Sequence, residues 1–295
     1  MASAVTRLPD DQLFSLSAGY RAEMAAKRRT TIVGLAVIIA CTILAGWVAE
    51  VDIRKFLANA YRFTDYIGRI FYLDTGKHVF TDIGEWFWGL GKWTRQLLDT
   101  LLIAYLGTLL GAIAAFFLCF AASMNLATSP AQRFFARRFL EFCRTVPEIV
   151  FALIFVVAFG LGPVPGVLAI MIHTLGALGK LFAEVVENID MKPVEGAIAS
   201  GATRWQAIRY AVVPQVLSNF ASYGLLRFEI NVRGASVMGF VGAGGIGQDL
   251  IESIRKFYYS DVSAILLLII ATVMIIDMVT ERIRHNLLTM DQGRK

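Results

Sequence analysis

Charged residues, catalytic motifs and paired cysteines are scarce in this sequence. Only 17% of the 295 residues are Asp, Glu, Lys or Arg, whereas a soluble domain carries roughly 25%. No GxxxxGK[ST] phosphate loop, HExxH zinc motif or GxSxG nucleophile motif occurs. The cysteines Cys41, Cys119 and Cys143 lie in or beside apolar segments without CxxC spacing. We therefore expect a chain that is no enzyme and binds no metal or cofactor. Any ATP and Mg²⁺ would be held by a partner polypeptide.

Hydrophobic residues are abundant instead. They make up 57% of the chain, and the mean hydropathy is +0.61. The formal net charge is +5, but the basic residues stand beside apolar runs and do not form one patch interleaved with aromatic residues. This composition indicates a protein embedded in a lipid bilayer and does not favour nucleic acid as a partner.

Six segments are long and apolar enough to cross a bilayer, which takes about 20 residues. They are ~31–49, ~97–124, ~139–160, ~165–186, ~215–239 and ~261–281. Two prolines and three glycines within residues 160–166 predict the turn of a helical hairpin between the third and fourth segments. The predicted fold class is an all-α polytopic membrane protein with about six transmembrane helices.

Basic residues are distributed unevenly between the loops. Those at 27–29, 133–138, 187–213 and 282–284 fall on one side of a six-span topology, and the positive-inside rule makes that side cytoplasmic. Both termini are then cytoplasmic. The predicted layout is a cytoplasmic lead (1–30), a first span (31–49), an extracytoplasmic interfacial segment (50–96), a transmembrane domain (97–285) and a cytoplasmic tail (286–295).

Aromatic residues are concentrated near the end of the interfacial segment, as Trp86, Phe87, Trp88 and Trp93. Tryptophan is enriched where a membrane meets water. We expect these residues to anchor a helix at the outer interface, with stacking on a ligand as the alternative.

The cytoplasmic segment from Glu195 to Pro214 is too polar to span the membrane and too helix-prone for a simple linker. It resembles the EAA signature of ABC importer permeases, with Gly196, Ala211 and Val213 in place of Ala, Ile and Leu. The matching positions are Glu195, Gly196, Ala197, Gly201 and Pro214. We expect Gly201 to turn the chain between two short helices, so that residues 190–213 dock in a groove on an ATPase partner. The alternative is an ordinary cytoplasmic loop.

A glycine-rich stretch follows the fifth predicted span. Gly242, Gly244 and Gly247 fit the GxGxxG pattern of dinucleotide-binding proteins, and Gly245 stands at one of its variable positions. That pattern requires a strand before it and a helix after it, whereas this stretch lies between two spans. We expect a tight turn or re-entrant gate segment that is buried in protein so that its backbone groups are satisfied.

Several stretches together resemble the phosphonate ABC transporter permease family, over about residues 95–285. They are residues 144–148, 157–163, 173–174, 179–180, 227–233 and 239–247. The resemblance implies a type I ABC importer permease fold in a bacterial inner membrane, and alternating access driven by ATP. The implied partners are a second permease subunit in a homodimer, a dimer of cytoplasmic ABC ATPase subunits and a periplasmic phosphonate-binding protein.

Ionisable residues inside the predicted spans are candidates for the substrate pathway, because an ionisable side chain in the bilayer needs a partner or a wet cavity. They are Arg233, Glu229, Arg227 and His173. Glu229 and Arg233 are four residues apart and can pair on one helix face. Arg233 is expected to line the path of an anionic phosphonate, or, in the alternative, to form a purely structural ion pair.

Three further pairings are expected on structural grounds. Lys180 and Glu184 stand one turn apart, as do Arg144 and Glu148, and Asp277 is expected to face water or to pair with Arg282. The pattern Gly107-xxx-Gly111 in the second span is suited to close helix packing, including packing in a dimer.

Two other functions remain open at this point. A methionine-like cargo is compatible with the same machine, since the glycine-rich stretch also resembles methionine-type permeases. An ion-coupled secondary transporter is disfavoured because residues 227–233 have no second copy that would indicate inverted repeats.

Overall fold

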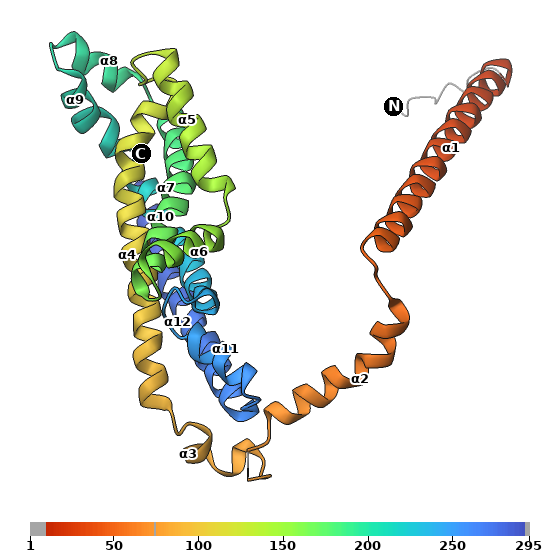
Figure 1. Cartoon of the computed structure of the whole chain (residues 1–295). Helices are drawn as coiled ribbons and strands as arrows, with labels where there is room; N and C mark the ends of the chain where they lie inside the picture. Colours follow the sequence, from red (N-terminus) through yellow and green to blue (C-terminus); the bar gives the residue numbers. More distant parts are fainter. Residues whose placement is uncertain (1–9, 74, 293–295) are drawn as a thin grey trace, which may run out of the picture. The chain divides into compact units, whose positions relative to one another are not determined.

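The computed structural model describes residues 10–73 and 75–292. No β-strand forms within these residues, and one isolated bridge joins Tyr72 and His78. The chain divides into two units, one ending at Asp65 and one beginning at Tyr66. The helices (Figure 1) are α1 (Asp10–Val48), α2 (Ile53–Ile70), η1 (Val79–Thr81), α3 (Ile83–Trp86), α4 (Leu90–Ala122), α5 (Pro130–Thr145), α6 (Glu148–Phe159), α7 (Pro163–Glu187), α8 (Lys192–Ala199), α9 (Arg204–Ala207), η2 (Ile208–Val212), α10 (Val213–Met238), η3 (Gly239–Val241), α11 (Gly247–Arg255) and α12 (Tyr259–Gln292).

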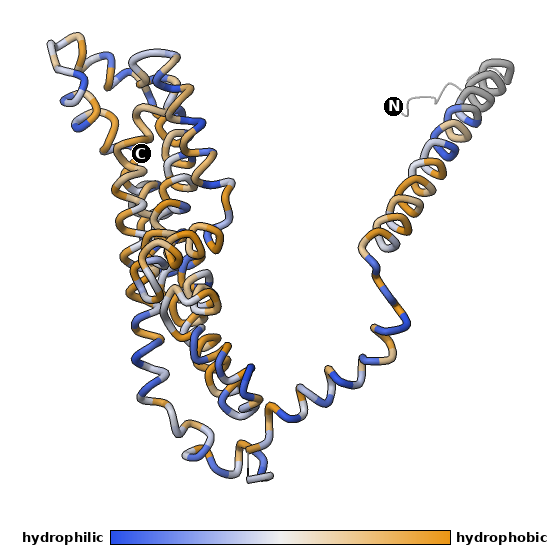
Figure 2. Tube along the Cα trace, in the orientation of Figure 1, coloured by the Kyte–Doolittle hydropathy of each residue, from blue (hydrophilic) through white to orange (hydrophobic). Residues whose placement is uncertain are grey.

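The first unit contains α1 and most of α2. The apolar part of α1, Glu23–Val48, is long enough to cross a membrane and contains residues 31–48 of the predicted first span. α2 begins after a four-residue link and alternates hydrophilic and hydrophobic residues along its length (Figure 2).

Three further helices of the second unit are long and apolar enough to cross a membrane: α4, α7 and the Tyr259–Leu287 part of α12. α4 and α7 pack closely because Gly107 and Gly111 have no side chains. A Cβ at Gly107 would lie 2.6 Å from Ile170 Cγ2, and one at Gly111 would lie 2.7 Å from the carbonyl oxygen of Met171. The GxxxG pattern therefore serves packing within the chain.

The third predicted span, ~139–160, is not a straight helix. It is divided between α5 and α6, whose axes differ by 85°. Pro147, which precedes α6, has no backbone N–H and disfavours helical geometry at Val146. Apolar composition suggested one continuous span, but this proline bends it.

The fifth predicted span corresponds to α10, which has 26 residues. α10 is not among the helices apolar enough to count as spans on composition alone, because it carries Arg227, Glu229 and Arg233. By length and composition alone, four of the described helices qualify as spans, or five if the bent pair is one span, and α10 corresponds to the remaining predicted segment.

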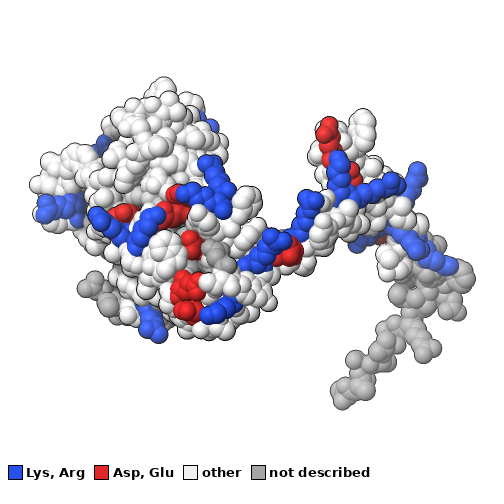
Figure 3. Space-filling model, turned by 60° about the horizontal axis from the view of Figure 1, so that its bottom comes forward, with Lys and Arg blue, Asp and Glu red and all other residues white. Residues whose placement is uncertain are grey.

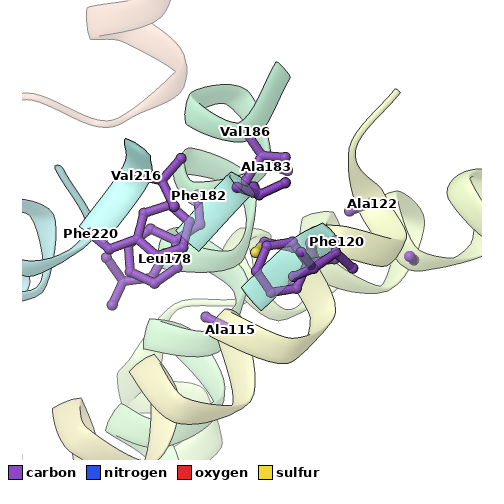
Figure 4. Packing of buried hydrophobic residues seen from close by; sticks show 14 of the residues in the cluster. Ala115, Phe120, Ala122, Leu178, Phe182, Ala183, Val186, Val216 and Phe220 are labelled. Atoms are coloured by element: carbon purple, nitrogen blue, oxygen red, sulfur yellow. The ribbon is translucent and has the colours of Figure 1, made fainter. Parts of the chain in front are cut away.

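The largest hydrophobic core joins α4, α5, α7, α10 and the α8–η2 segment. Phe182 and Phe220 stack with their ring centroids 3.9 Å apart (Figure 4). Val194 of α8 and Val216 of α10 are buried in the same core. In Figure 1, α8 and α9 lie at one end of this unit and α3 lies at the opposite end. The core thus fixes the base of the α8–η2 segment on the spanning helices.

Candidate functional site

The predicted docking segment forms two short helices joined by a turn. α8 ends at Ala199, and Gly201 adopts φ 86° before α9 begins at Arg204. The backbone N–H of Ala202 donates to the carbonyl of Ala197 over 3.1 Å, which closes the end of α8. A Cβ at Gly201 would meet nothing within 4 Å, so glycine is favoured there by backbone conformation and not by lack of space.

α9 continues into α10 through a π-helical segment, η2. The side chain of Gln206 accepts a hydrogen bond of 2.7 Å from the backbone N–H of Thr203, which caps the start of α9. Pro214 stands in the first turn of α10, and having no N–H it cannot make an α-helical bond to the carbonyl of Tyr210. π-helical segments are rare in proteins, and many of those that occur lie at functional sites.

The segment is tied to the loop between α4 and α5 as well as to α10. Arg204 donates hydrogen bonds to the Thr128 hydroxyl and the Leu126 carbonyl of that loop. Asn125, in the same loop, donates to the carbonyl of Val186 at the end of α7 over 2.8 Å. α8 and α9 are therefore connected both to α10 and to the α4–α5 loop.

The opposite side of the segment is exposed. Glu195 and Gly196 face outward, whereas Ala197 packs against the core. Ile198 and Trp205 are also exposed, Trp205 by 66%. This combination of a charge with large apolar side chains on short helices fits insertion into a groove of another protein.

The four candidate pathway residues do not form one site. Arg233 hydrogen-bonds to Glu229, as predicted, and its Nη2 atom also lies 3.7 Å from Asp277 Oδ1 on α12. The expected alternative for Asp277, Arg282, is not its ion-pair partner among the described side chains. Arg233 thus stands between two carboxylates, which compensate its charge.

Arg227 and His173 belong to a second group, at the break between α5 and α6. Arg227 Nη2 lies 4.0 Å from Glu148 Oε2, so Glu148 pairs with α10 and not with Arg144 as the sequence suggested. His173 Nδ1 lies 3.2 Å from the carbonyl oxygen of Val146, which ends α5. Lys180 and Glu184 pair as predicted, 3.9 Å apart. The second group therefore joins α7 and α10 to the bend.

Sequence reasoning missed Asn231, which is fully buried in α10. Its amide donates to the hydroxyls of Thr108 on α4 and Thr174 on α7, each over 2.8 Å. Buried amides need such partners because an unpaired polar group in an apolar interior is costly. The only signal in the sequence was an uncharged polar residue between the charged residues Glu229 and Arg233 of this span.

The glycine-rich stretch is a buried turn, as predicted. Gly242, Gly244 and Gly245 have φ of 79°, 87° and 82°. The N–H of Ile246 donates to Thr100 Oγ1 of α4 over 2.9 Å, and Gly162, in the turn between α6 and α7, donates to the Gly242 carbonyl over 3.0 Å. Gly247 contacts the backbone of η3 and α10 so closely that a Cβ has no room. The turn thus locks together α4, α10 and the α6–α7 hairpin.

The predicted interfacial tryptophans are mostly structural. Trp86 and Trp93 are buried, and Trp86 Nε1 donates to Ser263 Oγ over 2.9 Å. Trp88 is exposed but donates to Asp261 over 2.9 Å. Trp86 and Trp93 therefore attach residues 86–93 to α12 and do not face outward, whereas anchoring at the outer interface by the exposed Trp88 stays a prediction. Basic and acidic side chains are mixed over this end of the molecule (Figure 3).

Residues 107–288 match the family model described as the binding-protein-dependent transport system inner membrane component. A phosphite transport system permease protein of Stutzerimonas stutzeri is 44% identical over 65% of this chain and 70% of its own length. A protein of Escherichia coli (strain K12) named for a cryptic phosphonate transport system is 50% identical over 40% of this chain and 98% of its own.

Among solved structures, an inward-facing methionine ABC transporter has a chain with a similar fold. The TM-score is 0.58 at 17% identity, over 66% of this chain and 95% of that one. At that identity the likeness concerns the fold alone.

Proposed function

We propose that this chain imports phosphonate or a related phosphorus oxyanion such as phosphite or phosphate. It does so as the membrane permease subunit of an ATP-driven importer. The chain belongs to the family described as the binding-protein-dependent transport system inner membrane component. The names of the two relatives, one for phosphite and one for phosphonate, support this cargo class. The chain contributes the passage, and partner ATPase subunits contribute the hydrolysis.

The observation that carries the proposal is the α8–α9 segment. It presents exposed Glu195, Ile198 and Trp205, while its other side is fixed in the core through Val194. A docking element needs both features, because a partner must grip it and the membrane helices must follow it. Glu195, Gly196, Ala197, Gly201 and Pro214 are assigned to this coupling role.

The proposed mechanism is alternating access. Closure of an ATPase dimer draws α8 and α9 with it, and η2 and Arg204 pass the displacement to α10 and to the α4–α5 loop. The contacts Arg227–Glu148 and Asn231–Thr174 then carry motion of α10 to α6 and α7. Hydrolysis reverses the displacement and releases cargo on the cytoplasmic side.

The proposed assembly is a homodimer of this chain with two cytoplasmic ATPase subunits and a periplasmic binding protein. Both termini and the α8–α9 segment lie on the cytoplasmic side, as the distribution of basic loops indicates. The buried glycine turn at 242–247 is assigned to the gate at the outer side of the passage, where it holds α4, α10 and the α6–α7 hairpin together. Compensated by Glu229 and Asp277, Arg233 acts mainly as a structural bridge between α10 and α12.

Co-purification tests the coupling role. Glu195→Lys reverses the exposed charge of α8 and is expected to release the ATPase subunits while the chain still inserts in the membrane. Glu281→Lys makes the same change at an exposed position on α12 and is the matched control. If Glu195→Lys keeps its ATPase subunits and transports normally, the coupling assignment is wrong.

Uptake into proteoliposomes tests the cargo. ATP is enclosed, the binding protein is added outside, and labelled 2-aminoethylphosphonate, phosphite, phosphate or methionine is supplied in turn. ATP-dependent uptake of a phosphorus oxyanion, unaffected by ionophores, is expected. Uptake of methionine alone would replace the cargo, and uptake abolished by ionophores without need for ATP would indicate a secondary transporter.

A further inference from the structure

α2 has two sharply separated faces. With about 100° of rotation per residue, its large apolar residues fall within one half of the helix circumference and its charged residues within the other. The apolar half contains Ile53, Phe56, Leu57, Ala60, Phe63 and Ile67, and the polar half contains Arg54, Lys55, Asn59, Arg62, Asp65 and Arg69. Such a division is typical of a helix that lies at a boundary between water and an apolar phase.

The apolar face of α2 is exposed in the described chain. Phe56 is 73% exposed, Leu57 67% and Phe63 69%. Soluble surfaces rarely carry a contiguous apolar patch made of such large side chains. The face therefore requires an occupant.

The position of α2 in the chain limits where that occupant is. The apolar part of α1 ends at Val48. The N–H of Val51 then donates to the carbonyl of Gly46 over 2.9 Å, and Glu50 adopts φ 53°, so the chain turns directly at the end of α1. Asp52 accepts a hydrogen bond from the N–H of Lys55 over 3.0 Å and caps the start of α2. Even fully extended, the link of residues 49–52 spans only about 15 Å, so α2 begins beside the membrane surface.

The charges of α2 indicate the chemistry of that surface. Its polar half has four cations and one acid, Asp65. Lys55 Nζ lies 3.6 Å from Asp52 Oδ2, and the Arg69 guanidinium lies 5.9 Å from the centroid of the Tyr259 ring, so the attraction to a surface rests on Arg54 and Arg62. Cationic side chains on an interfacial helix are attracted to anionic phospholipid headgroups. A zwitterionic surface offers no such attraction.

We propose that α2 lies in the headgroup region of the bilayer, with its apolar face toward the acyl chains and its cations on anionic phospholipids. The helix fixes the end of α1 to one leaflet. The inference requires only that α1 spans the membrane. It does not depend on the cargo or on the ATPase partner.

Hydrogen exchange of the full-length chain in lipid nanodiscs tests the proposal. Amides of residues 53–70 are compared in nanodiscs of phosphatidylcholine alone and of phosphatidylcholine with phosphatidylglycerol. Stronger protection with phosphatidylglycerol is expected. Arg54→Gln with Arg62→Gln should reduce it by up to about 30-fold, at about 1 kcal/mol for each cation near an anionic surface.

Two alanines provide a matched pair for the apolar contact. Ala60 lies on the apolar face and Ala58 on the polar face, and both are exposed and two residues apart. Ala60→Gln is expected to lower the protection severalfold, and Ala58→Gln to leave it unchanged. Neither position belongs to the coupling segment, so co-purification of the ATPase is expected to stay normal in both variants.

Three results would overturn the proposal. One is fast exchange of α2 in both lipid mixtures, and another is equal protection in both. The third is protection in detergent without phospholipid or only after the binding protein is added, which would identify a protein as the occupant. None of these results bears on cargo uptake, so the two proposals fail separately.

Discussion

Replacing two glycines by alanine separates backbone strain from close packing. Gly201 and Gly245 have nearly the same φ, 86° and 82°, and a left-handed conformation costs a non-glycine residue about 1–2 kcal/mol. A Cβ at Gly201 would meet nothing within 4 Å, whereas one at Gly245 would lie 2.5 Å from Thr100 Oγ1. That hydroxyl also accepts the hydrogen bond from Ile246.

The expected costs differ accordingly. Gly201→Ala should lower the free energy of unfolding by the strain alone, about 1–2 kcal/mol. Gly245→Ala adds overpacking, typically about 1–3 kcal/mol, and disturbs a buried hydrogen bond, so a total of roughly 2–5 kcal/mol is expected. Gly196→Ala, in α8 with open space and ordinary φ, is the control and should be neutral or slightly stabilising.

Reversible unfolding of the full chain in mixed micelles measures these differences. Gly245→Ala is expected to destabilise the protein most, Gly201→Ala less and Gly196→Ala least. If Gly245→Ala is no more destabilising than Gly201→Ala, the turn at 242–247 is not packed against α4 as described.

Two more substitutions test how motion passes through the protein. Arg204→Ala removes the hydrogen bonds to the α4–α5 loop and is expected to lower transport per ATP hydrolysed severalfold while the ATPase stays bound. Arg209→Ala, an exposed neighbour without those bonds, should leave the ratio unchanged, and equal effects would contradict the role of Arg204. Gly234→Ala directs a Cβ into the Glu148 carboxylate and is expected to reduce transport severalfold, whereas Gly224→Ala meets open space. Equal transport rates in these two variants would show that the α6–α10 contact carries no motion.

Local signals in the sequence predicted local features correctly. Gly201 lies at a left-handed turn between two short helices, and the glycines at 242–247 form a buried turn. Both follow from the conformational freedom of glycine and the need to satisfy buried backbone groups. The pairing of Glu229 with Arg233 follows from a spacing of one helical turn.

Features that depend on contacts between distant residues could not be predicted. The partner of Glu148 is Arg227, on another helix, and not Arg144 one turn away. The partner of Asp277 is likewise Arg233. Trp86 and Trp93 match the composition of a membrane interface, but their burial against α12 depends on tertiary packing. The 85° bend between α5 and α6 was not predicted, because the apolar residues of α6 suggested that one continuous span runs through Pro147.

We propose that this chain couples ATP hydrolysis by a partner to import of a phosphorus oxyanion. The most direct measurement is the ATPase activity of the reconstituted permease–ATPase complex with its binding protein empty, or loaded with 2-aminoethylphosphonate, phosphate or methionine. Stimulation by the phosphonate-loaded binding protein is the predicted result. Stimulation by the methionine-loaded form alone would contradict the cargo, and failure of the chain to bind any ATPase would contradict the claim itself.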